Sequence, residues 1–521
     1  MTKPNVVLMF VDDLGYGDVS CFNPESKIPT PHIDALAKNG MKFTDSHSVS
    51  ALCTPSRYGL LTGRYPFRSD IKYTVITGDS MPLIEDDRMT LADLFKENGY
   101  KTSCVGKWHL GLRWQLNQNF REHAALGEQK LYDDVPQRVG DKATVVPLVS
   151  TWVESLDIDF TKPILNGPCE HGFDYFYGMA ASLDTPPYLY IENNMAMTQP
   201  TRLSGCMHVD RATATMQQDW QCGPIAEGFD HVQVLDDMND KVLELIDNYT
   251  ENDEKFFIYY PTPAVHGPIL PNKKFQGKSG INAYGDIVMQ LDDMVGQITK
   301  KLSDKNILED TIFIFTSDNG CSGVADLPFL ESKGHFSSAI YKSHKMSLYE
   351  GGHRVPTIIS CPNMIEKNTS CNKNICHTDF FATFAQLFSQ ELKDDVAEDS
   401  FSNLALWEGT GDCERTSSVY TCLTGHLGVV KDGWKLNCCE NGCETKELIL
   451  STFKGEYCPQ KFELYNLNVD PSEANNLIDN ESEKVEELTV ELIKVFDNGR
   501  STKGEKQENN LCDNWHQINF K

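Results

Sequence analysis

Short apolar runs alternate along the first two-thirds of the chain with segments in which apolar side chains recur at helical spacing. The apolar runs are rich in β-branched and aromatic residues and predict strands at 6–10, 102–105, 256–260 and 311–315. The helical spacing predicts helices near 33–38, 91–97, 232–248 and 284–302. Gly40 and Gly99 follow the first two helices at positions typical of a helix C-cap.

This alternation predicts an α/β fold, because near-continuous apolar strands are typical of a mostly parallel sheet covered by helices on both faces. After about residue 400 the strands become shorter and more polar, and a last helix is predicted near 484–496. We therefore expect a catalytic α/β domain over 1–400 and a smaller α+β subdomain over 401–521 that contains an antiparallel sheet. Residues 113–162 show no clear periodicity and predict a long surface excursion.

The charge balance excludes some classes of partner. The 521 residues include 47 Lys and Arg against 75 Asp and Glu, a net charge of −28. Sequence-independent binding to nucleic acid or to an anionic lipid surface is therefore not expected, and an anionic substrate would need a local basic pocket. No apolar run approaches the roughly 18 residues of a membrane-spanning helix, so no membrane span is expected. The oligomeric state is not predicted.

The cysteine content favours an oxidising compartment with disulfides, since the chain has 17 cysteines with a dense group at 438–458. Asn-x-Ser/Thr triplets at Asn248, Asn368 and Asn480 agree with a secreted or lysosomal glycoprotein. The first predicted strand begins too early for a signal peptide to precede it, so we expect a mature chain. The alternative is a cytosolic protein with many reduced thiols.

Oxygen-bearing side chains follow two of the predicted strands. Asp12 and Asp13 follow the first strand, and Asp318 and Asn319 follow the strand at 311–315. Open α/β sheets bind ligands at the carboxyl ends of their strands, and oxygen-only ligands suit Ca²⁺ or Mg²⁺. Each pair alone is more often a turn or a helix cap, but two pairs at matching strand ends favour a metal site.

The segment Cys53-Thr54-Pro55-Ser56-Arg57 predicts a helix start, because Pro is favoured in the first turn of a helix. Cys53 would then lie at a helix N-terminus, where free N–H groups and the helix dipole stabilise negative charge. Arg57, one turn later, would project toward the same end. The alternative is a disulfide-bonded cysteine beside an ordinary cap.

The motif Cys53-x-Pro55-x-Arg57 is followed by Leu61-Thr62-Gly63-Arg64 and, about fifty residues later, by GKWHLG at 106–111. Further motifs are PAVHGP at 263–268, YEGGHRVP at 349–356 and ELYNL at 463–467. Together with the acidic strand ends, these motifs resemble the type I, formylglycine-dependent sulfatase family, including its arylsulfatase-like members. The resemblance covers nearly the whole chain.

The resemblance implies an alkaline-phosphatase-like sandwich, with a large mixed, mostly parallel sheet between helices and a small C-terminal antiparallel sheet with a helix. It implies that a formylglycine-generating enzyme oxidises Cys53 to Cα-formylglycine, whose hydrate is the nucleophile. Removing Cys53 from the count leaves 16 cysteines, an even number. The implied reaction is hydrolysis of a sulfate monoester to an alcohol and inorganic sulfate through a covalent sulfo-enzyme.

The resemblance also implies roles for individual residues. The metal, Ca²⁺ by resemblance with Mg²⁺ as the alternative, would be held by Asp12, Asp13, Cys53, Asp318 and Asn319. Positive charge would come from Arg57, Lys107 and Lys345, and sulfate would be contacted by Lys107, Ser182, His266 and Lys345. His266 or Lys345 would protonate the leaving alcohol, and His109 would take the proton of the second hydroxyl at position 53. For His109 a packed core histidine, and for His266 a loop residue, remain the alternatives.

The expected substrate is a sulfated sugar attacked in an exo manner, with artificial aryl sulfates also accepted. The loop at 182–194 and the excursion at 113–162 would shape the leaving-group subsite, with Pro186, Pro187, Tyr188 and Tyr190 offering apolar faces. His335, His344 and His353 are weaker candidates for substrate contacts. Two alternatives remain: a phosphate or phosphonate monoester hydrolase on the same scaffold, and a secreted non-catalytic glycan-binding protein.

Overall fold

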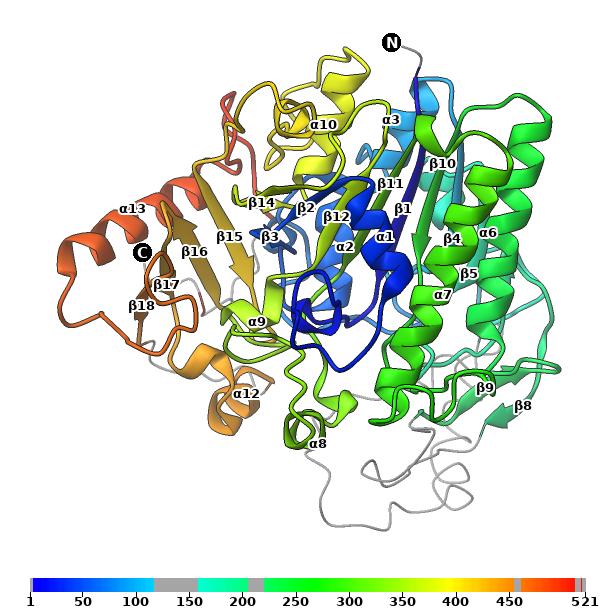
Figure 1. Cartoon of the computed structure of the whole chain (residues 1–521), viewed down its shortest axis with the longest axis horizontal. Coiled ribbons are helices and arrows are strands. Elements are labelled where there is room, and N and C mark those ends of the chain that lie inside the picture. The colour runs from blue at the N-terminus through cyan, green and yellow to red at the C-terminus, as the bar shows by residue number, and fades with distance from the viewer. Residues whose placement is uncertain (1–2, 117–157, 205–219, 454–460, 511–516, 518–521) are drawn as a thin grey trace.

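The computed structural model describes residues 3–116, 158–204, 220–453, 461–510 and 517. Its centre is a ten-stranded sheet (Figure 1). In spatial order the strands are β13 (Thr369–Cys371), β2 (Met41–Phe43), β12 (Thr357–Ser360), β11 (Thr311–Ser317), β1 (Asn5–Val11), β10 (Phe256–Pro261), β4 (Lys101–Lys107), β5 (Tyr175–Met179), β6 (Ile191–Glu192) and β7 (Met195–Ala196).

The five strands β11, β1, β10, β4 and β5 are mutually parallel, and antiparallel pairing appears only toward the two sides of the sheet. Every residue of β1, β10 and β11 is buried, which explains why these strands are continuous apolar runs rather than alternating ones. The predicted large mixed, mostly parallel sheet is therefore confirmed, with strand bounds that differ by one or two residues.

Helices cover both faces of this sheet. One layer contains α1 (Pro31–Lys38), α6 (Val234–Glu251) and α7 (Ala283–Asp304), and α7 contacts both of the others (Figure 1). A second layer contains α2 (Cys53–Thr62), α3 (Leu91–Glu97), α10 (Asp379–Leu387) and α11 (Leu404–Trp407). Two short helices, α8 (Leu327–Ser332) and α9 (Glu350–His353), precede β12. The predicted long helices at 232–248 and 284–302 are thus found with shifted ends.

A second, antiparallel sheet lies beside the large one (Figure 1). It consists of β15 (Ser417–Thr421), β16 (Leu427–Lys431), β17 (Trp434–Asn437) and β18 (Glu463–Asn466), and α13 (Ser482–Asp497) packs against β16 and β17. The small predicted sheet with its helix is confirmed, while the boundary near residue 400 stays a prediction. The remaining described elements are α12 (Lys446–Phe453) and the pairs β3 (Ser46–His47) with β14 (Ile375–Cys376) and β8 (Pro200–Ser204) with β9 (Gly223–Ala226).

The cysteines do not form a network of disulfides in the described part of the chain. One disulfide is present there, between Cys439 and Cys443. Cys371 and Cys376, close in sequence, are not joined. Buried thiols such as Cys104 and Cys321 contribute to the main core, where a free cysteine behaves as a small apolar side chain. The cysteine count therefore predicts more crosslinks than these residues contain.

Two features of the described residues concern the surface. Among the described helices, none is both long and apolar enough to cross a membrane. The asparagines of the three glycosylation triplets, Asn248, Asn368 and Asn480, are all exposed, so each is accessible to modification. Glycosylation and passage through a secretory compartment remain predictions. The predicted excursion at 113–162 falls largely on residues 117–157, which lie outside the described residues.

Candidate active site

The candidate site lies where the five parallel strands end. Asp12 and Asp13 follow β1, Asp318 and Asn319 follow β11, and Lys107 is the last residue of β4. The backbone links these ends directly, because the Asp318 amide donates to the Val11 carbonyl at 2.8 Å and the Asp12 amide donates to the Ala264 carbonyl after β10 at 2.7 Å. Side chains separated by up to three hundred positions in sequence therefore share one buried edge of the sheet.

Three oxygen atoms at this edge are buried and have no hydrogen-bond partner: Asp12 Oδ1, Asp13 Oδ2 and Asn319 Oδ1. Buried polar atoms are almost always paired, so a group of orphaned oxygens in one place indicates that something else binds there. Carboxylate oxygens of Asp12 and Asp318 and the thiol of Cys53 also lie within 4.8 Å of one another. This donor set fits a hard divalent cation such as Ca²⁺ or Mg²⁺.

Cys53 is the first residue of α2 and is only 2% exposed, so the predicted position at a helix N-terminus is confirmed. Leu52, rather than a polar side chain, is the N-cap residue. The chain leaves α2 at Gly63, whose φ of 65° requires the left-handed region that glycine adopts readily. Burial raises the pKa of the Cys53 thiol above its ordinary value, which keeps the unmodified side chain in its neutral form.

Three cations surround the carboxylates. Arg57 Nη2 lies 2.7 Å from Asp318 Oδ2, Lys107 Nζ lies 2.6 Å from Asp12 Oδ2, and Lys345 Nζ lies 2.6 Å from Asp13 Oδ1. All of these side chains are at least nine-tenths buried. Buried charges are tolerated only when they are paired, so cations and acids stabilise each other here. The predicted basic pocket is thus present within an acidic protein.

The two carboxyls nearest Arg57 differ in acidity. Burial alone would raise the pKa of Asp12, but the charges of Lys107, His266, Arg57 and Lys345 outweigh it and lower that pKa. Burial and the charge of Asp12 raise the pKa of Asp318 to about 7. Asp12 therefore keeps its charge across the physiological pH range, whereas burial and repulsion from Asp12 disfavour the charged form of Asp318.

Backbone geometry aims Lys107 into the site. Gly106 has a φ of 137°, and a Cβ there would lie 2.2 Å from the Pro261 carbonyl oxygen of neighbouring β10. Only glycine permits this close approach of β4 to β10. Two residues after Lys107, His109 adopts a φ of 57°, a conformation rare for a residue with a side chain. Such backbone strain is concentrated at functional sites in proteins.

The orientation of His109 defines its tautomer. Its Nε2 lies 2.8 Å from the Ile76 carbonyl oxygen, which can only accept, so Nε2 carries the proton. Nδ1 is therefore unprotonated, and it is buried without a hydrogen-bond partner. Burial, together with the charges of Lys107 and Arg57, holds the pKa of His109 well below its ordinary value. His109 is therefore a buried imidazole with a lowered pKa and one ring nitrogen that makes no hydrogen bond.

His266 is oriented in the opposite sense. Its Nδ1 donates to the Gly267 carbonyl oxygen at 2.7 Å, and its Nε2 lies 3.7 Å from Asp13 Oδ2. Asp184 Oδ1 lies 4.0 Å from the same Nδ1. Asp184 was not predicted from the sequence, because it stands in a loop that carries no motif. It becomes a neighbour of His266 only in the folded protein.

The remaining candidates are placed as follows. Ser182 is buried in the loop after β5, two residues beyond Ala180, whose carbonyl accepts a hydrogen bond from the His109 amide at 2.9 Å. Tyr188 is 1% exposed and packs on His231, so the expectation that it offers a face to substrate is wrong. Tyr190 is partly buried and stacks on Tyr177.

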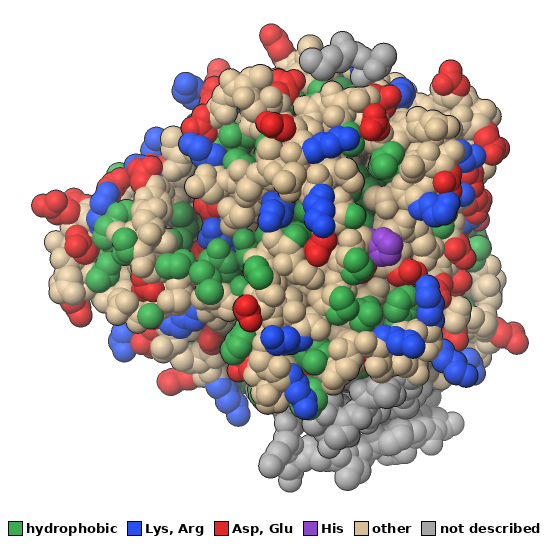
Figure 2. Space-filling view, in the orientation of Figure 1, with side chains coloured by type: hydrophobic (Ala, Val, Ile, Leu, Met, Phe, Trp, Pro, Cys, Tyr) green, Lys and Arg blue, Asp and Glu red, His purple; other side chains and the backbone are tan. Residues whose placement is uncertain are grey.

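The three weaker histidine candidates have other partners. His335 Nε2 lies 2.8 Å from Asp18 Oδ1, and His353 lies in a separate buried cluster with His47. His344 Nδ1 bonds to the Lys345 carbonyl at 3.0 Å. On the face shown in Figure 2, Lys and Arg side chains are interspersed with Asp and Glu, and no broad basic surface is seen there. This face therefore presents no continuous basic patch that would attract a polyanion.

Comparison with known proteins agrees with this geometry. A family model described as sulfatase matches residues 4–390, and one described as N-sulphoglucosamine sulphohydrolase, C-terminal, matches residues 341–501. The chain belongs to the sulfatase family. It is an enzyme that hydrolyses sulfuric esters, and its fold is the alkaline-phosphatase-like fold of its structural neighbours.

The matches to three relatives cover between 80% and 95% of this sulfatase chain. It is 34% identical over 496 residues to an N-acetylgalactosamine-6-O-sulfatase of Bacteroides thetaiotaomicron, covering 95% of this chain and 93% of the relative. Human arylsulfatase A is 30% identical over 422 residues, covering 80% and 70%. A solved structure, titled for the metabolism of multiple glycosaminoglycans by Bacteroides thetaiotaomicron, superposes with a TM-score of 0.76 at 30% identity, covering 95% of this chain and 99% of that one.

Proposed function

We propose that this sulfatase uses Cys53, converted to Cα-formylglycine, to hydrolyse a 6-O-sulfate ester on an amino sugar. The observation that supports the nucleophile is the position of Cys53: it begins α2 and its sulfur lies within 4.8 Å of carboxylate oxygens of Asp12 and Asp318. When present, the hydrated aldehyde supplies a hydroxyl nucleophile and a second hydroxyl through which the aldehyde re-forms. A simple thiol or alcohol lacks this second hydroxyl.

Mass spectrometry of the peptide that carries Cys53 tests the conversion. The chain is expressed with and without a formylglycine-generating enzyme, and the expected result is the mass change from a CH₂SH to a CHO side chain, together with sulfatase activity, only in its presence. The Cys53→Ala variant should be inactive under both conditions. A thiol that stays unmodified in both preparations would refute the formylglycine mechanism for this chain.

We further propose that Asp12, Asp13, Asp318 and Asn319 hold a divalent cation, Ca²⁺ or Mg²⁺. The orphaned oxygens of Asp12, Asp13 and Asn319 support this assignment, and they fit the oxygen preference of these ions. The cation supplies positive charge for a sulfate oxygen and acidifies the hydroxyl at position 53. Treatment with a chelator should abolish turnover, and adding back Ca²⁺ or Mg²⁺ separately identifies the ion.

The protein's own cations bind and orient the sulfate. A sulfate monoester is an anion that repels a nucleophile, so charges fixed before binding lower the barrier. Lys107 pairs with Asp12 and Lys345 pairs with Asp13. Arg57, which donates to the Lys107 carbonyl at 3.1 Å, fixes the end of β4. Because all three are buried among acids, they are held in place without substrate.

We assign proton transfer to His109 and to either His266 or Lys345. His109 presents an unprotonated Nδ1 and can take a proton from a hydroxyl on residue 53. His266, with Nε2 near Asp13, and Lys345 are the candidates to protonate the leaving alcohol.

The substrate proposal rests on the relative that is 34% identical over 95% of this chain and is named an N-acetylgalactosamine-6-O-sulfatase. Turnover of N-acetylgalactosamine 6-sulfate, its 4-sulfate isomer and an artificial aryl sulfate should be compared, with the phosphate ester of the same aryl alcohol included. We expect the 6-sulfate to be preferred over the 4-sulfate. Equal turnover of the two isomers would refute the proposed position, and preference for the phosphate would favour the phosphoesterase alternative.

A further inference from the structure

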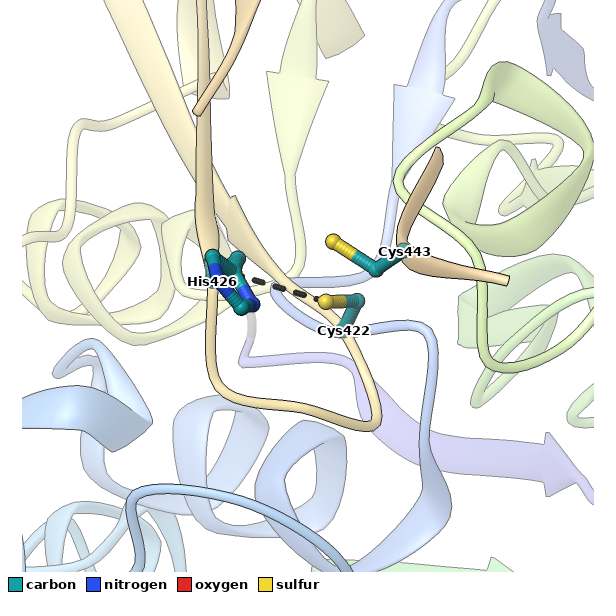
Figure 3. Close-up of side chains that lie close together, drawn as sticks. All are labelled: Cys422, His426 and Cys443. Carbon is teal, nitrogen blue, oxygen red and sulfur yellow. Dashed lines mark hydrogen bonds between the residues drawn. The ribbon is translucent and has the colours of Figure 1, made fainter. Parts of the chain in front are cut away.

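A second cluster of metal-ligating side chains lies in the small-sheet region, apart from the oxygen-rich site. Cys422, His426 and Cys443 are all buried, and one potential ligand atom from each lies within 4.8 Å of the others. Figure 3 shows the three side chains directed toward one another, Cys422 and His426 from one loop and Cys443 from a separate segment. Sulfur and nitrogen donors favour a softer ion than the oxygens at the catalytic edge.

Two tight turns create this juxtaposition. The first joins β15 to β16, where the Gly425 amide donates to the Cys422 carbonyl at 3.0 Å and Gly425 has a φ of 76°. The Cys422 thiol lies 3.7 Å from the His426 carbonyl oxygen, and His426 Nδ1 lies 2.8 Å from Thr424 Oγ1. These contacts hold the thiol and the imidazole on the same side of the turn.

The second turn follows β17 and carries Cys439 and Cys443, which form a disulfide. Cys439 packs in the same apolar cluster as Cys422 and Cys443, and its sulfur is bonded to that of Cys443. Cys439-x₃-Cys443 has the spacing of a cysteine pair in structural zinc sites, which are closed, tetrahedral and made of cysteine and histidine. Cys422 and His426 would supply the second pair of ligands. Neighbouring Cys438 instead lies in the core around α13 and supplies no ligand.

We propose that Cys422, His426, Cys439 and Cys443 bind a structural zinc ion when the Cys439–Cys443 pair is in the dithiol state. Reduction of the disulfide adds two electrons and two protons, and a trialkylphosphine accomplishes this with water while becoming the phosphine oxide. Zinc then displaces the protons of three thiols and accepts the neutral imidazole as its fourth ligand. The disulfide and the zinc site are therefore mutually exclusive states of one cluster.

The cluster is positioned to stabilise the region next to Lys345. The Leu423 amide, in the first turn, donates to the Met346 carbonyl at 3.1 Å. The Leu348 amide donates to the Gly442 carbonyl, in the second turn, also at 3.1 Å. Zinc would join the two turns to each other and so fix both against the segment at 346–348.

Cobalt substitution tests the site, because Co²⁺ bound by thiolates gives charge-transfer absorption that oxygen ligands do not give. The full chain carries Cys53→Ala, which removes the thiol of the catalytic site, and is reduced with phosphine before Co²⁺ is added. We expect one equivalent of thiolate-bound Co²⁺, displaced by Zn²⁺, and none in the oxidised chain. Cys422→Ser should weaken the absorption and the affinity, whereas Cys438→Ala should leave both unchanged.

Absence of thiolate-to-cobalt absorption in the reduced chain would overturn the proposal, as would absorption that Cys422→Ser and Cys443→Ser leave intact. A second measurement avoids variants that fail to fold. In the reduced wild-type chain, Zn²⁺ should slow alkylation of Cys422, Cys439 and Cys443 by about tenfold or more, followed peptide by peptide. Alkylation rates that zinc does not change at these three positions would also refute the site.

Discussion

Two buried charge clusters in this sulfatase look alike in composition but differ in how their atoms are paired. One is the catalytic edge of the large sheet. The other, which we call the junction cluster, connects the small sheet to the large unit and contains Lys435 of β17, Glu350 and His353 of α9, and Glu473. Lys435 Nζ lies 2.8 Å from Glu350 Oε1, 3.0 Å from Glu473 Oε1 and 3.1 Å from His353 Nε2.

The difference lies in what each cluster leaves unpaired. In the junction cluster a lysine lies between the acids, and the oxygen that makes no hydrogen bond, Glu473 Oε1, lies 3.0 Å from Lys435 Nζ. Both ring nitrogens of His353 have partners, His47 Nδ1 at 3.0 Å and the Leu348 carbonyl at 3.1 Å. At the catalytic edge, oxygens of Asp12, Asp13 and Asn319 remain without a partner despite three nearby cations. Burial of charge therefore does not distinguish the two clusters, whereas the three gathered oxygens without a partner do, and these oxygens support the proposed metal site.

The largest effect is expected for Lys107→Ala. The variant removes a cation that we assign to sulfate binding and leaves Asp12 buried without its 2.6 Å partner. Turnover of an aryl sulfate should fall by about a thousandfold, as for loss of one preorganised charge in other active sites. Steady-state kinetics of formylglycine-containing protein measures this, with thermal melting to confirm folding.

Lys101→Ala is the matched control for that variant, because Lys101 begins the same strand but is 48% exposed. Its turnover should equal that of the wild type. If Lys107→Ala folds and keeps wild-type turnover, the two buried clusters do not differ in function as we propose.

His109→Gln should lower turnover by about a hundredfold with little change in KM, because it removes a base rather than a binding group. The control is His335→Gln, which changes another buried histidine, one paired with Asp18 at 2.8 Å. That variant should lower the melting temperature and leave turnover per folded molecule nearly unchanged. Equal losses of turnover in both variants would contradict the assignment of His109 as the base.

Lys435→Met should lower stability and leave turnover nearly unchanged, which is the reverse of the effect expected for Lys107→Ala. It leaves Glu473 buried without its cation and leaves Glu350 paired with Arg354 alone, so the free energy of unfolding should fall by about 3–5 kcal/mol. Turnover per folded molecule should change by less than about twofold, since these residues do not face the site. Chemical denaturation and kinetics on the same preparation test this. Lys431→Met, at a lysine that is 25% exposed, should cost less than about 1 kcal/mol.

The smallest effect concerns His377, which lies between the two clusters: its amide donates to the His47 carbonyl, and its Nε2 contacts Thr316 Oγ1 at 3.0 Å. Burial, and then the charge of His47, lower the pKa of His377 to about 3. The unfolded chain therefore takes up a proton at higher pH than the folded chain, and this histidine reduces stability as pH falls from about 6.5 toward 3.

His377→Gln should flatten the dependence of the unfolding free energy on pH over this range, by up to about 1.4 kcal/mol per pH unit. Denaturant titrations at a series of pH values measure the slope. Identical slopes for variant and wild type would show that His377 is not the group that titrates.

Prediction from the sequence succeeded where the signal is local. Apolar continuity identified β1, β10 and β11, and helical spacing identified α6 and α7, because burial on both faces or on one face imposes these periods. It failed for Tyr188, whose burial against His231 depends on the path of a distant loop. The cysteine count was also a poor guide to pairing, because a buried thiol and a half-cystine look the same in sequence.

The sequence by itself determined the fold class and the chemical groups of this sulfatase, since strand continuity, helix starts and the motif at 53–57 are properties of neighbouring residues. Only the tertiary structure decided which of those groups are poised to act. The unprotonated Nδ1 of His109 depends on the Ile76 carbonyl, 33 positions away, and the orphaned oxygens of Asp13 and Asn319 depend on two strands separated by 306 positions. Which ring nitrogen carries a proton, and which oxygens lack a partner, depend on residues that are neighbours only in the folded protein. The order of residues along the chain does not specify those neighbours.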